Sequence, residues 1–127
     1  GGNIALGSAV DFINQIGHEN LQNHENELLT YAQKKLLELD GIKIYGEKAN
    51  RTGVVSFNLD GAGIASDTGM ILDKMGIAVR TGHHCTQPIM DFFSIAGTVR
   101  ASFAVYNTLE EIDILVEGVK KAQKMLV

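Results

Sequence analysis

Apolar side chains recur along this chain with two different spacings. Near the start, in the middle and at the end they recur every three to four residues, the spacing of one helix face. Between these stretches, short segments alternate apolar and polar side chains, as in strands with one buried face. The alternation is clearest in residues 54–59, where Val55, Phe57 and Leu59 share one face. The pattern therefore predicts both helices and strands.

The two spacings predict four helices and four strands. The helices are expected at about Ile4–Ile16, Glu19–Leu39, Ser66–Met75 and Leu109–Leu126. The strands are expected at Ile42–Tyr45, Val54–Leu59, Ile77–Arg80 and Thr98–Ala104. A turn region at Gly46–Gly53 joins the first two strands into an antiparallel hairpin. The order of elements predicts an α+β fold, with an antiparallel or mixed sheet of about four strands covered by helices.

Three local signals help to place the ends of the predicted helices. Thr108 followed by Glu111 fits a capping box at the start of the last helix. Gly76 is a good residue to end the third helix. The segment Gly61–Gly63 lacks the lysine of a phosphate-binding loop, so a turn before the third helix is the simpler interpretation.

The composition is that of an ordinary globular domain. The 127 residues fit one domain, and no apolar run approaches the ~18 residues that span a bilayer. A net charge of −4 gives no indication of a nucleic-acid or anionic-membrane partner. The single cysteine excludes an internal disulfide and fits the cytoplasm. The start at Gly1, without methionine, suggests a piece of a longer polypeptide.

Two arginines fall on the polar side of their predicted strands. Arg100 shares a face with Thr98 and Ser102, and Arg80 points away from the expected core. Two guanidinium groups on such a face could hold a carboxylate through paired hydrogen bonds. The alternative is that they are solvated or pair with acids such as Asp73 or Asp91.

The stretch between these arginines has no strand periodicity and contains the cysteine. Residues 81–97 are expected to form a loop, with one helical turn around Ile89–Phe93. Cationic neighbours favour the reactive thiolate form of a cysteine, and Cys85 follows His83 and His84. The alternative, a small buried hydrophobe, requires apolar neighbours, which Cys85 lacks. Consecutive residues seldom converge on one metal ion, so no metal site is predicted.

Three sequence motifs together resemble a known family. They are Arg-Thr-Gly-His-His-Cys-Thr-Gln-Pro at 80–88, Thr-Val-Arg-Ala-Ser at 98–102, and Tyr-Asn-Thr-Leu-Glu-Glu-Ile-Asp at 106–113. They resemble the C-terminal part of SufS/CsdA-type (group II) cysteine desulfurases, pyridoxal-phosphate enzymes of the class V aminotransferase superfamily. The resemblance runs the whole length. It implies that residues 1–127 form the small C-terminal domain of a fold-type I enzyme.

The resemblance also implies a reaction and a set of roles. Such enzymes convert L-cysteine to L-alanine and keep the sulfur as a persulfide for iron–sulfur cluster assembly. By this analogy Cys85 is the persulfide-forming nucleophile and Arg100 binds the substrate carboxylate. Arg80 would order the site or stabilise the thiolate. His83 and His84 match the motif as acid/base or loop-ordering residues, with the choice left open.

Part of the family's active site is not expected within these 127 residues. The Schiff-base lysine and the cofactor contacts belong to a larger N-terminal domain in the family. Lysines on the amphipathic helices are not candidates; they are Lys74, Lys120, Lys121 and Lys124. We therefore expect no cofactor-binding residues here, poor binding of pyridoxal phosphate and no activity of the chain alone.

The resemblance leaves the substrate and the partner open. A selenocysteine lyase, or another class V enzyme, shares the fold and the cofactor, and a free-standing thiol- or metal-binding module is a non-catalytic alternative. Group II enzymes pass sulfur to a SufE-type or SufU-type acceptor. Some that use SufU carry a histidine before the aspartate that corresponds to Asp67; Ser66 here favours a SufE-type partner. The full enzyme is expected to be a homodimer, and this chain a monomer.

Overall fold

An antiparallel sheet with helices on both faces organises the computed structural model, which describes residues 1–48, 52–61 and 65–127. The helices are α1 (Gly2–Ile16), α2 (His18–Leu37), α3 (Ala65–Lys74), α4 (Gln87–Phe93) and α5 (Leu109–Leu126). The strands are β1 (Ile42–Tyr45), β2 (Val54–Leu59), β3 (Arg80–Gly82) and β4 (Thr98–Ser102). The predicted α+β class is confirmed. Residues 49–51 of the expected turn and 62–64 of the glycine segment lie outside the described residues.

The strands lie in the order β1-β2-β4-β3, and every neighbouring pair is antiparallel. The expected β1–β2 hairpin pairs Tyr45 with Ser56. Ser56 in turn pairs with Arg100, and Arg100 with Arg80. Directly paired residues point to the same face of a sheet. One row of side chains, Tyr45-Ser56-Arg100-Arg80, therefore crosses all four strands.

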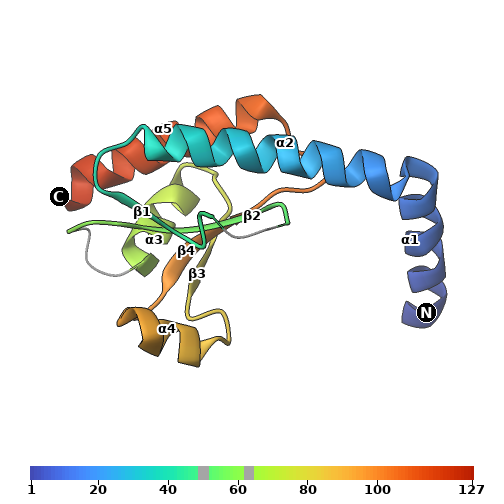
Figure 1. Ribbon diagram of the computed structural model, residues 1–127, viewed down its shortest axis with the longest axis horizontal. Helices are drawn as coiled ribbons and strands as arrows, with labels where there is room; N and C mark the ends of the chain where they lie inside the picture. Colours follow the sequence, from blue (N-terminus) through green and yellow to red (C-terminus); the bar gives the residue numbers. More distant parts are fainter. Residues whose placement is uncertain (49–51, 62–64) are drawn as a thin grey trace.

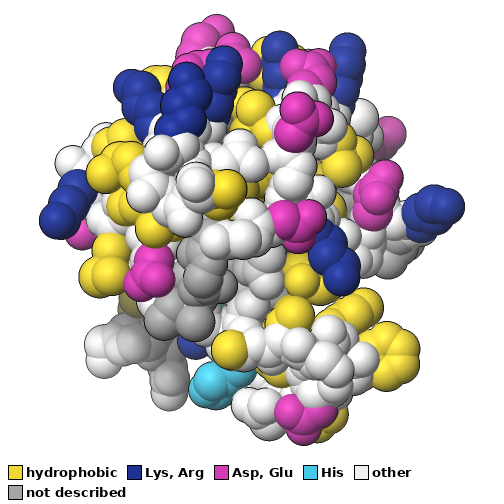
Figure 2. All heavy atoms as spheres, turned by 90° about the vertical axis from the view of Figure 1, so that its left-hand side faces the viewer, with side chains coloured by type: hydrophobic (Ala, Val, Ile, Leu, Met, Phe, Trp, Pro, Cys, Tyr) yellow, Lys and Arg dark blue, Asp and Glu magenta, His cyan; other side chains and the backbone are white. Residues whose placement is uncertain are grey.

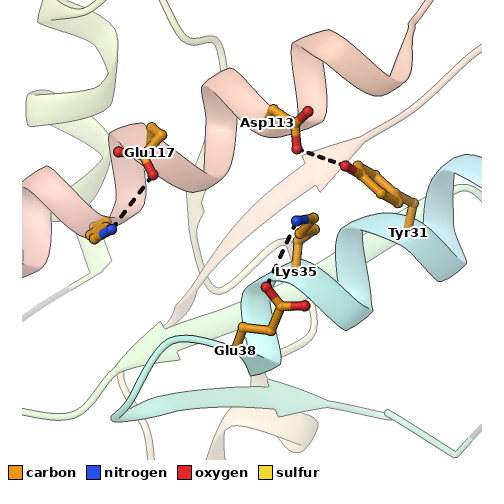
Figure 3. Close-up of polar contacts among 6 residues, drawn as sticks. Tyr31, Lys35, Glu38, Asp113 and Glu117 are labelled. Carbon is orange, nitrogen blue, oxygen red and sulfur yellow. Dashed lines mark hydrogen bonds and ion pairs between the residues drawn. The ribbon is translucent and has the colours of Figure 1, made fainter.

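The opposite face carries the hydrophobic core beneath α2, α3 and α5. Burial in β2 alternates along the strand, with Val55, Phe57 and Leu59 buried. These side chains join one cluster with buried apolar residues of β4 and the three helices. Figure 1 shows α2 and α5 on one side of the sheet and α4 on the other. At their surface, the Tyr31 hydroxyl of α2 donates a 2.9 Å hydrogen bond to Asp113 of α5 (Figure 3).

The expected signals at two helix ends are confirmed. The Thr108 side chain accepts from the Glu111 amide, and the Glu111 side chain accepts from the Thr108 amide, which completes the capping box. Gly76 follows α3 with a φ of 76°, a left-handed conformation that glycine adopts without strain. The amides of Gly76 and Ile77 donate to Asp73 and Leu72, the two bonds of a Schellman motif.

The first helix forms where the periodicity predicts it, but its apolar residues are not buried. None of the α1 residues belongs to the core, and Ile4 is 80% exposed. The helix extends from the far end of α2, away from the sheet (Figure 1). Periodicity reports that a helix has an apolar face, not which partner covers it. None of the helices in the described part of the chain is long and apolar enough to cross a membrane.

The third strand is shifted relative to its prediction. It was expected at Ile77–Arg80 and forms at Arg80–Gly82 instead. Ile77 and Val79 do pack against the core, as their spacing indicated. They lie outside the strand pairing, although the register would place Val79 opposite Ala101, within β4. Side-chain alternation alone does not show where hydrogen-bonded pairing stops.

Candidate active site

Both predicted arginines lie on the sheet face opposite the core. Arg80 stands directly opposite Arg100 across β3 and β4. Like charges in directly paired positions repel each other, so this arrangement costs stability unless an anion is bound between them. The alternative was that the arginines are solvated or pair with acids such as Asp73 or Asp91. Arg80 is indeed exposed, but neither arginine forms an ion pair with a described acid. In residues 1–48, 52–61 and 65–127 the ion pairs are Lys35–Glu38 and Lys120–Glu117 only.

Cys85 lies at the surface in a tight turn just after β3. Its side chain is exposed and its backbone is left-handed, with φ values of 53° at His84 and 60° at Cys85. The Cys85 amide donates a 3.0 Å hydrogen bond to Nδ1 of His83. The amide and hydroxyl of Thr86 both donate to the His83 carbonyl. Two successive non-glycine residues in this conformation need such local support.

His84 turns back toward the sheet, whereas His83 stays exposed. The Nε2 atom of His84 lies 3.1 Å from the Thr98 carbonyl oxygen and 3.0 Å from the Thr98 hydroxyl. A carbonyl oxygen only accepts, so Nε2 carries the proton and Nδ1 is the unprotonated nitrogen. Burial is the main cause that holds the pKa of His84 below its usual value; the hydrogen bond to the Thr98 carbonyl opposes it, and the positive charges of Arg100 and Arg80 add to it. His84 is therefore a neutral side chain at physiological pH.

Helix α4 covers part of the same sheet face and is longer than the single turn expected at Ile89–Phe93. Met90 is its buried anchor. The ring of Phe93 meets the ring of Tyr45 edge-on, with centroids 5.1 Å apart. Tyr45 thereby connects the first strand to the helix that follows the cysteine. Figure 2 shows most of the charged side chains over the upper part of the molecule, where the helices lie, and few of them over the lower part, where apolar side chains lie among white ones.

A cavity of about 380 Å³ opens between α4, the cysteine loop and the sheet. Six of its lining residues have polar side chains: Arg100, His84, Thr98, Ser56, Thr86 and Tyr45. The remaining lining is Gly46, Ile89, Met90, Phe93 and Ile95. A few polar groups in a mostly apolar hollow are typical of a small-molecule site.

Three buried polar atoms in the described chain have no hydrogen-bond partner, and all belong to this face. They are Nε of Arg100, Nδ1 of His84 and Oδ1 of Asn58. The Asn58 amide nitrogen is already used, since it donates to Gly97 O at 2.9 Å and to the Tyr45 hydroxyl at 3.3 Å. Unpaired buried polar atoms are rare and costly, and they concentrate at functional sites. No group of three His, Cys, Asp or Glu side chains in the described ranges could hold a metal ion.

The family model for "Aminotransferase class-V" matches residues 1–115. This chain belongs to the aminotransferase class-V family. Two similar curated relatives are a cysteine desulfurase of Serratia proteamaculans and a probable cysteine desulfurase of Halalkalibacterium halodurans. The first is 46% identical over 98% of this chain, and the second 45% identical over 97%. The chain spans about 30% of the length of each.

Solved structures of the class-V family share the fold described above. The cysteine desulfurase CsdA from Escherichia coli, in an S-sulfonic acid form, matches with a TM-score of 0.89 and 31% identity. That match covers 98% of this chain and 30% of CsdA. The apo cysteine desulfurase from Thermococcus onnurineus NA1 matches with a TM-score of 0.80 and 37% identity, over 92% of this chain and 28% of that one.

The structure brings together some of the five residues that the sequence motifs indicated. Arg100 and His84 line the cavity, and Arg80 stands opposite Arg100 on the same sheet face. His83 and Cys85 are exposed in the turn beside His84 and are not among the residues that line the cavity. Sequence reasoning assigned no role to Tyr45, Asn58 or Thr98. The alternation in β2 placed Asn58 on the polar face, which was a usable indication. The link from Tyr45 to Phe93 depends on tertiary packing and could not be seen in the sequence.

Proposed function

We propose that this chain is the part of a cysteine desulfurase that supplies the sulfur nucleophile and the substrate-carboxylate site. The observation that carries the proposal is the exposed Cys85, held in a constrained turn beside a cavity that contains Arg100. Curated relatives named as cysteine desulfurases, 43–46% identical over nearly all of this chain, support it. Because the chain spans about 30% of those relatives, the activity belongs to a longer protein.

The proposed reaction transfers one sulfur atom from L-cysteine to Cys85. The Cys85 thiolate attacks the sulfur of the substrate, and a sulfur–sulfur bond forms as the substrate carbon–sulfur bond breaks. The electron pair of the broken bond stays with the substrate carbon, which takes up a proton to give alanine. The products are alanine and a persulfide on Cys85, with no external oxidant or reductant.

The two arginines have separate roles in this proposal. Arg100 is half-buried and lines the cavity, and its unpaired Nε lies on the face where a carboxylate would bind. Arg100 would therefore bind the substrate carboxylate through charge-assisted hydrogen bonds. Arg80 is exposed and adds a second positive charge directly opposite it. Arg80 would raise the affinity of the site for anions and stabilise the thiolate.

The cavity does not by itself fit the family's cofactor. Pyridoxal phosphate, when bound, withdraws the electrons released at the substrate carbon, and it needs a lysine for covalent attachment. No lysine lines the cavity. We propose that this lysine and most cofactor contacts come from outside these 127 residues. The chain alone would then bind the cofactor poorly and turn over no L-cysteine.

The downstream partner follows from the same proposal. A persulfide on an exposed cysteine is accessible to a thiol of another protein, so sulfur would pass to an acceptor of the SufE or SufU type for iron–sulfur cluster assembly in the cytoplasm. Ser66, at the position that precedes Asp67, favours the SufE type. The full protein would act as a homodimer.

The decisive experiment uses the longer protein that contains these residues. With pyridoxal phosphate and L-cysteine, it should form alanine and gain one sulfur atom on the peptide that contains Cys85, seen by mass spectrometry. Cys85→Ser should abolish both, while Arg100→Lys should mainly raise KM. Unchanged alanine formation by Cys85→Ser would contradict the role of Cys85. Preference for L-selenocysteine over L-cysteine would favour the lyase alternative.

A further inference from the structure

Both ends of the cysteine loop meet at one residue of the sheet. The loop leaves β3 at Gly82, which pairs with Thr98, and it returns to β4 at Thr98 itself. Gly97, just before Thr98, lies so close to Gly82 that a Cβ atom on it would stand 2.7 Å from the Gly82 carbonyl carbon. On its other side, the Gly97 carbonyl is held by the Asn58 amide at 2.9 Å. Thr98 therefore sits at a fixed base of the loop.

The His84 ring connects the middle of the loop to this base. Its Nε2–H points at two acceptors of one residue, the carbonyl and the hydroxyl of Thr98. Both His84 and Thr98 are removed from bulk water to a large extent, and Thr98 is only 2% exposed. A hydrogen bond in such a place is costly to lose because the buried groups would stay unpaired. The contact thus restrains the residue next to Cys85.

The contact acts where the backbone is least able to hold its own conformation. His84 and Cys85 are both left-handed, which non-glycine residues adopt only when their surroundings impose it. On the other flank, the Nδ1 atom of His83 accepts the Cys85 amide. Thr98 and Arg100 lie two residues apart on one strand and share a face. Holding His84 on Thr98 therefore sets Cys85 at a fixed place relative to Arg100.

We propose that Thr98 is a positioning residue that holds His84 by Nε2 and thereby fixes the turn that carries Cys85 relative to the strand that carries Arg100. This inference rests on the proposed function, since a position matters only if Cys85 is the nucleophile. It decides between the two roles that the sequence left open for His84. His84 orders the loop, and its Nε2 proton stays on the Thr98 oxygens rather than moving to a substrate.

The test combines NMR spectroscopy with amide hydrogen exchange on the 127-residue chain. Long-range ¹H–¹⁵N spectra should show His84 with its proton on Nε2. Thr98→Val keeps the side-chain shape and removes the hydroxyl, but it leaves the Thr98 carbonyl as an acceptor for Nε2. It should therefore speed exchange of the Cys85 and Thr86 amides by about threefold, less than the roughly tenfold effect of losing a whole hydrogen bond. Thr98→Ser should restore exchange to within about twofold. His84→Asn tolerates the left-handed turn but is too short to reach Thr98, and should match or exceed the effect of Thr98→Val.

Ser102→Ala is the matched control, because Ser102 is exposed on the same face of β4, at the opposite end of the strand from Thr98. It should leave the exchange rates unchanged. A proton on Nδ1 of His84, or equal exchange in Thr98→Val and the unmodified chain, would overturn the inference. These readouts involve no desulfuration. Failure to turn over L-cysteine in the longer protein would count against the proposed function alone.

Discussion

The two faces of the sheet differ in how they use the same four strands. On one face, Phe57 and its neighbours are fully buried beneath three helices, and every apolar side chain has apolar partners. On the other, among the described residues, a row of polar and charged side chains is covered in part by the seven-residue α4 and the cysteine loop. The unpaired buried polar atoms of the described chain all lie on this second face.

Within strand β4, the side chains that stabilise the fold and the side chains that form the site lie on opposite faces. In β4, Val99 and Ala101 contribute to the core, whereas the alternate residues Thr98 and Arg100 face the site. A rigid core holds the strand in place, so the charged side chains on its reverse keep their positions without mutual support. Substitutions on the two faces should therefore have effects of different size and kind.

The largest expected effect comes from removing a large buried side chain from the core. Phe57→Ala should lower the free energy of unfolding by about 3–5 kcal/mol, because it leaves a large cavity among side chains that cannot close around it. Urea unfolding followed by circular dichroism measures this loss. Phe92→Ala makes the same change where the ring is 81% exposed, and should cost within about 0.5 kcal/mol. Similar losses at the two positions would contradict the division between the faces.

A smaller loss is expected from the anchor of α4 on the site face. Met90→Ala should cost about 2 kcal/mol, the low end for such a change, because a short helix with few partners relaxes into the space. The measurement is again urea unfolding. Ile89→Ala, on the same helix but 51% exposed, is the control and should cost less. A loss at Met90 as large as that at Phe57 would show that both faces are equally well packed.

Removing the cap at the start of α5 should cause a smaller, local loss of stability. Thr108→Ala removes the side chain that accepts from the Glu111 amide, and should cost about 1 kcal/mol. Thr108→Ser keeps the hydroxyl and should retain most of the stability. Thermal unfolding of the three proteins compares them directly. If the serine variant were as unstable as the alanine variant, the methyl group rather than the cap would be responsible.

The smallest effect concerns pH and the site face. The pKa of His84 is lowered in the folded state, so the unfolded chain binds this proton more readily. The contribution of His84 to stability is complete above the unfolded pKa of about 6.5 and declines as the pH falls below it. His84→Gln removes this titration. The unmodified chain should therefore lose more stability than the variant between about pH 7.5 and pH 5.5, as measured by urea unfolding. A parallel loss would contradict the burial of a neutral His84.

Much of the fold could be predicted because local physical rules determine it. The bounds of β1, β2 and α5 agree with the prediction, since alternation and a capping box mark them directly. The position of β3 was wrong because side-chain alternation does not show where hydrogen-bonded pairing begins or stops. The exposure of the apolar face of α1 could not be foreseen, because periodicity does not identify the partner of a helix.

Part of the site could also be predicted, because side-chain alternation and local sequence mark it. Strand parity placed Arg80 and Arg100 on one face, and the histidine–cysteine run marked the loop. That the arginines stand directly opposite each other depends on strand register, which the sequence of either strand alone does not contain. The hydrogen bonds of His84 to Thr98, fourteen residues away, likewise arise only when the loop closes on the sheet.

The facing arginines have a thermodynamic consequence that is independent of catalysis. Neither arginine has an acidic partner among the described residues, so their mutual repulsion lowers the stability of the folded chain. Any anion that binds between them relieves this repulsion, and it stabilises the folded form in proportion to the logarithm of its concentration once that exceeds Kd. The melting temperature of this chain should therefore rise as anions occupy the site between the two arginines. Candidate ligands can be compared by this rise before any reaction is observed.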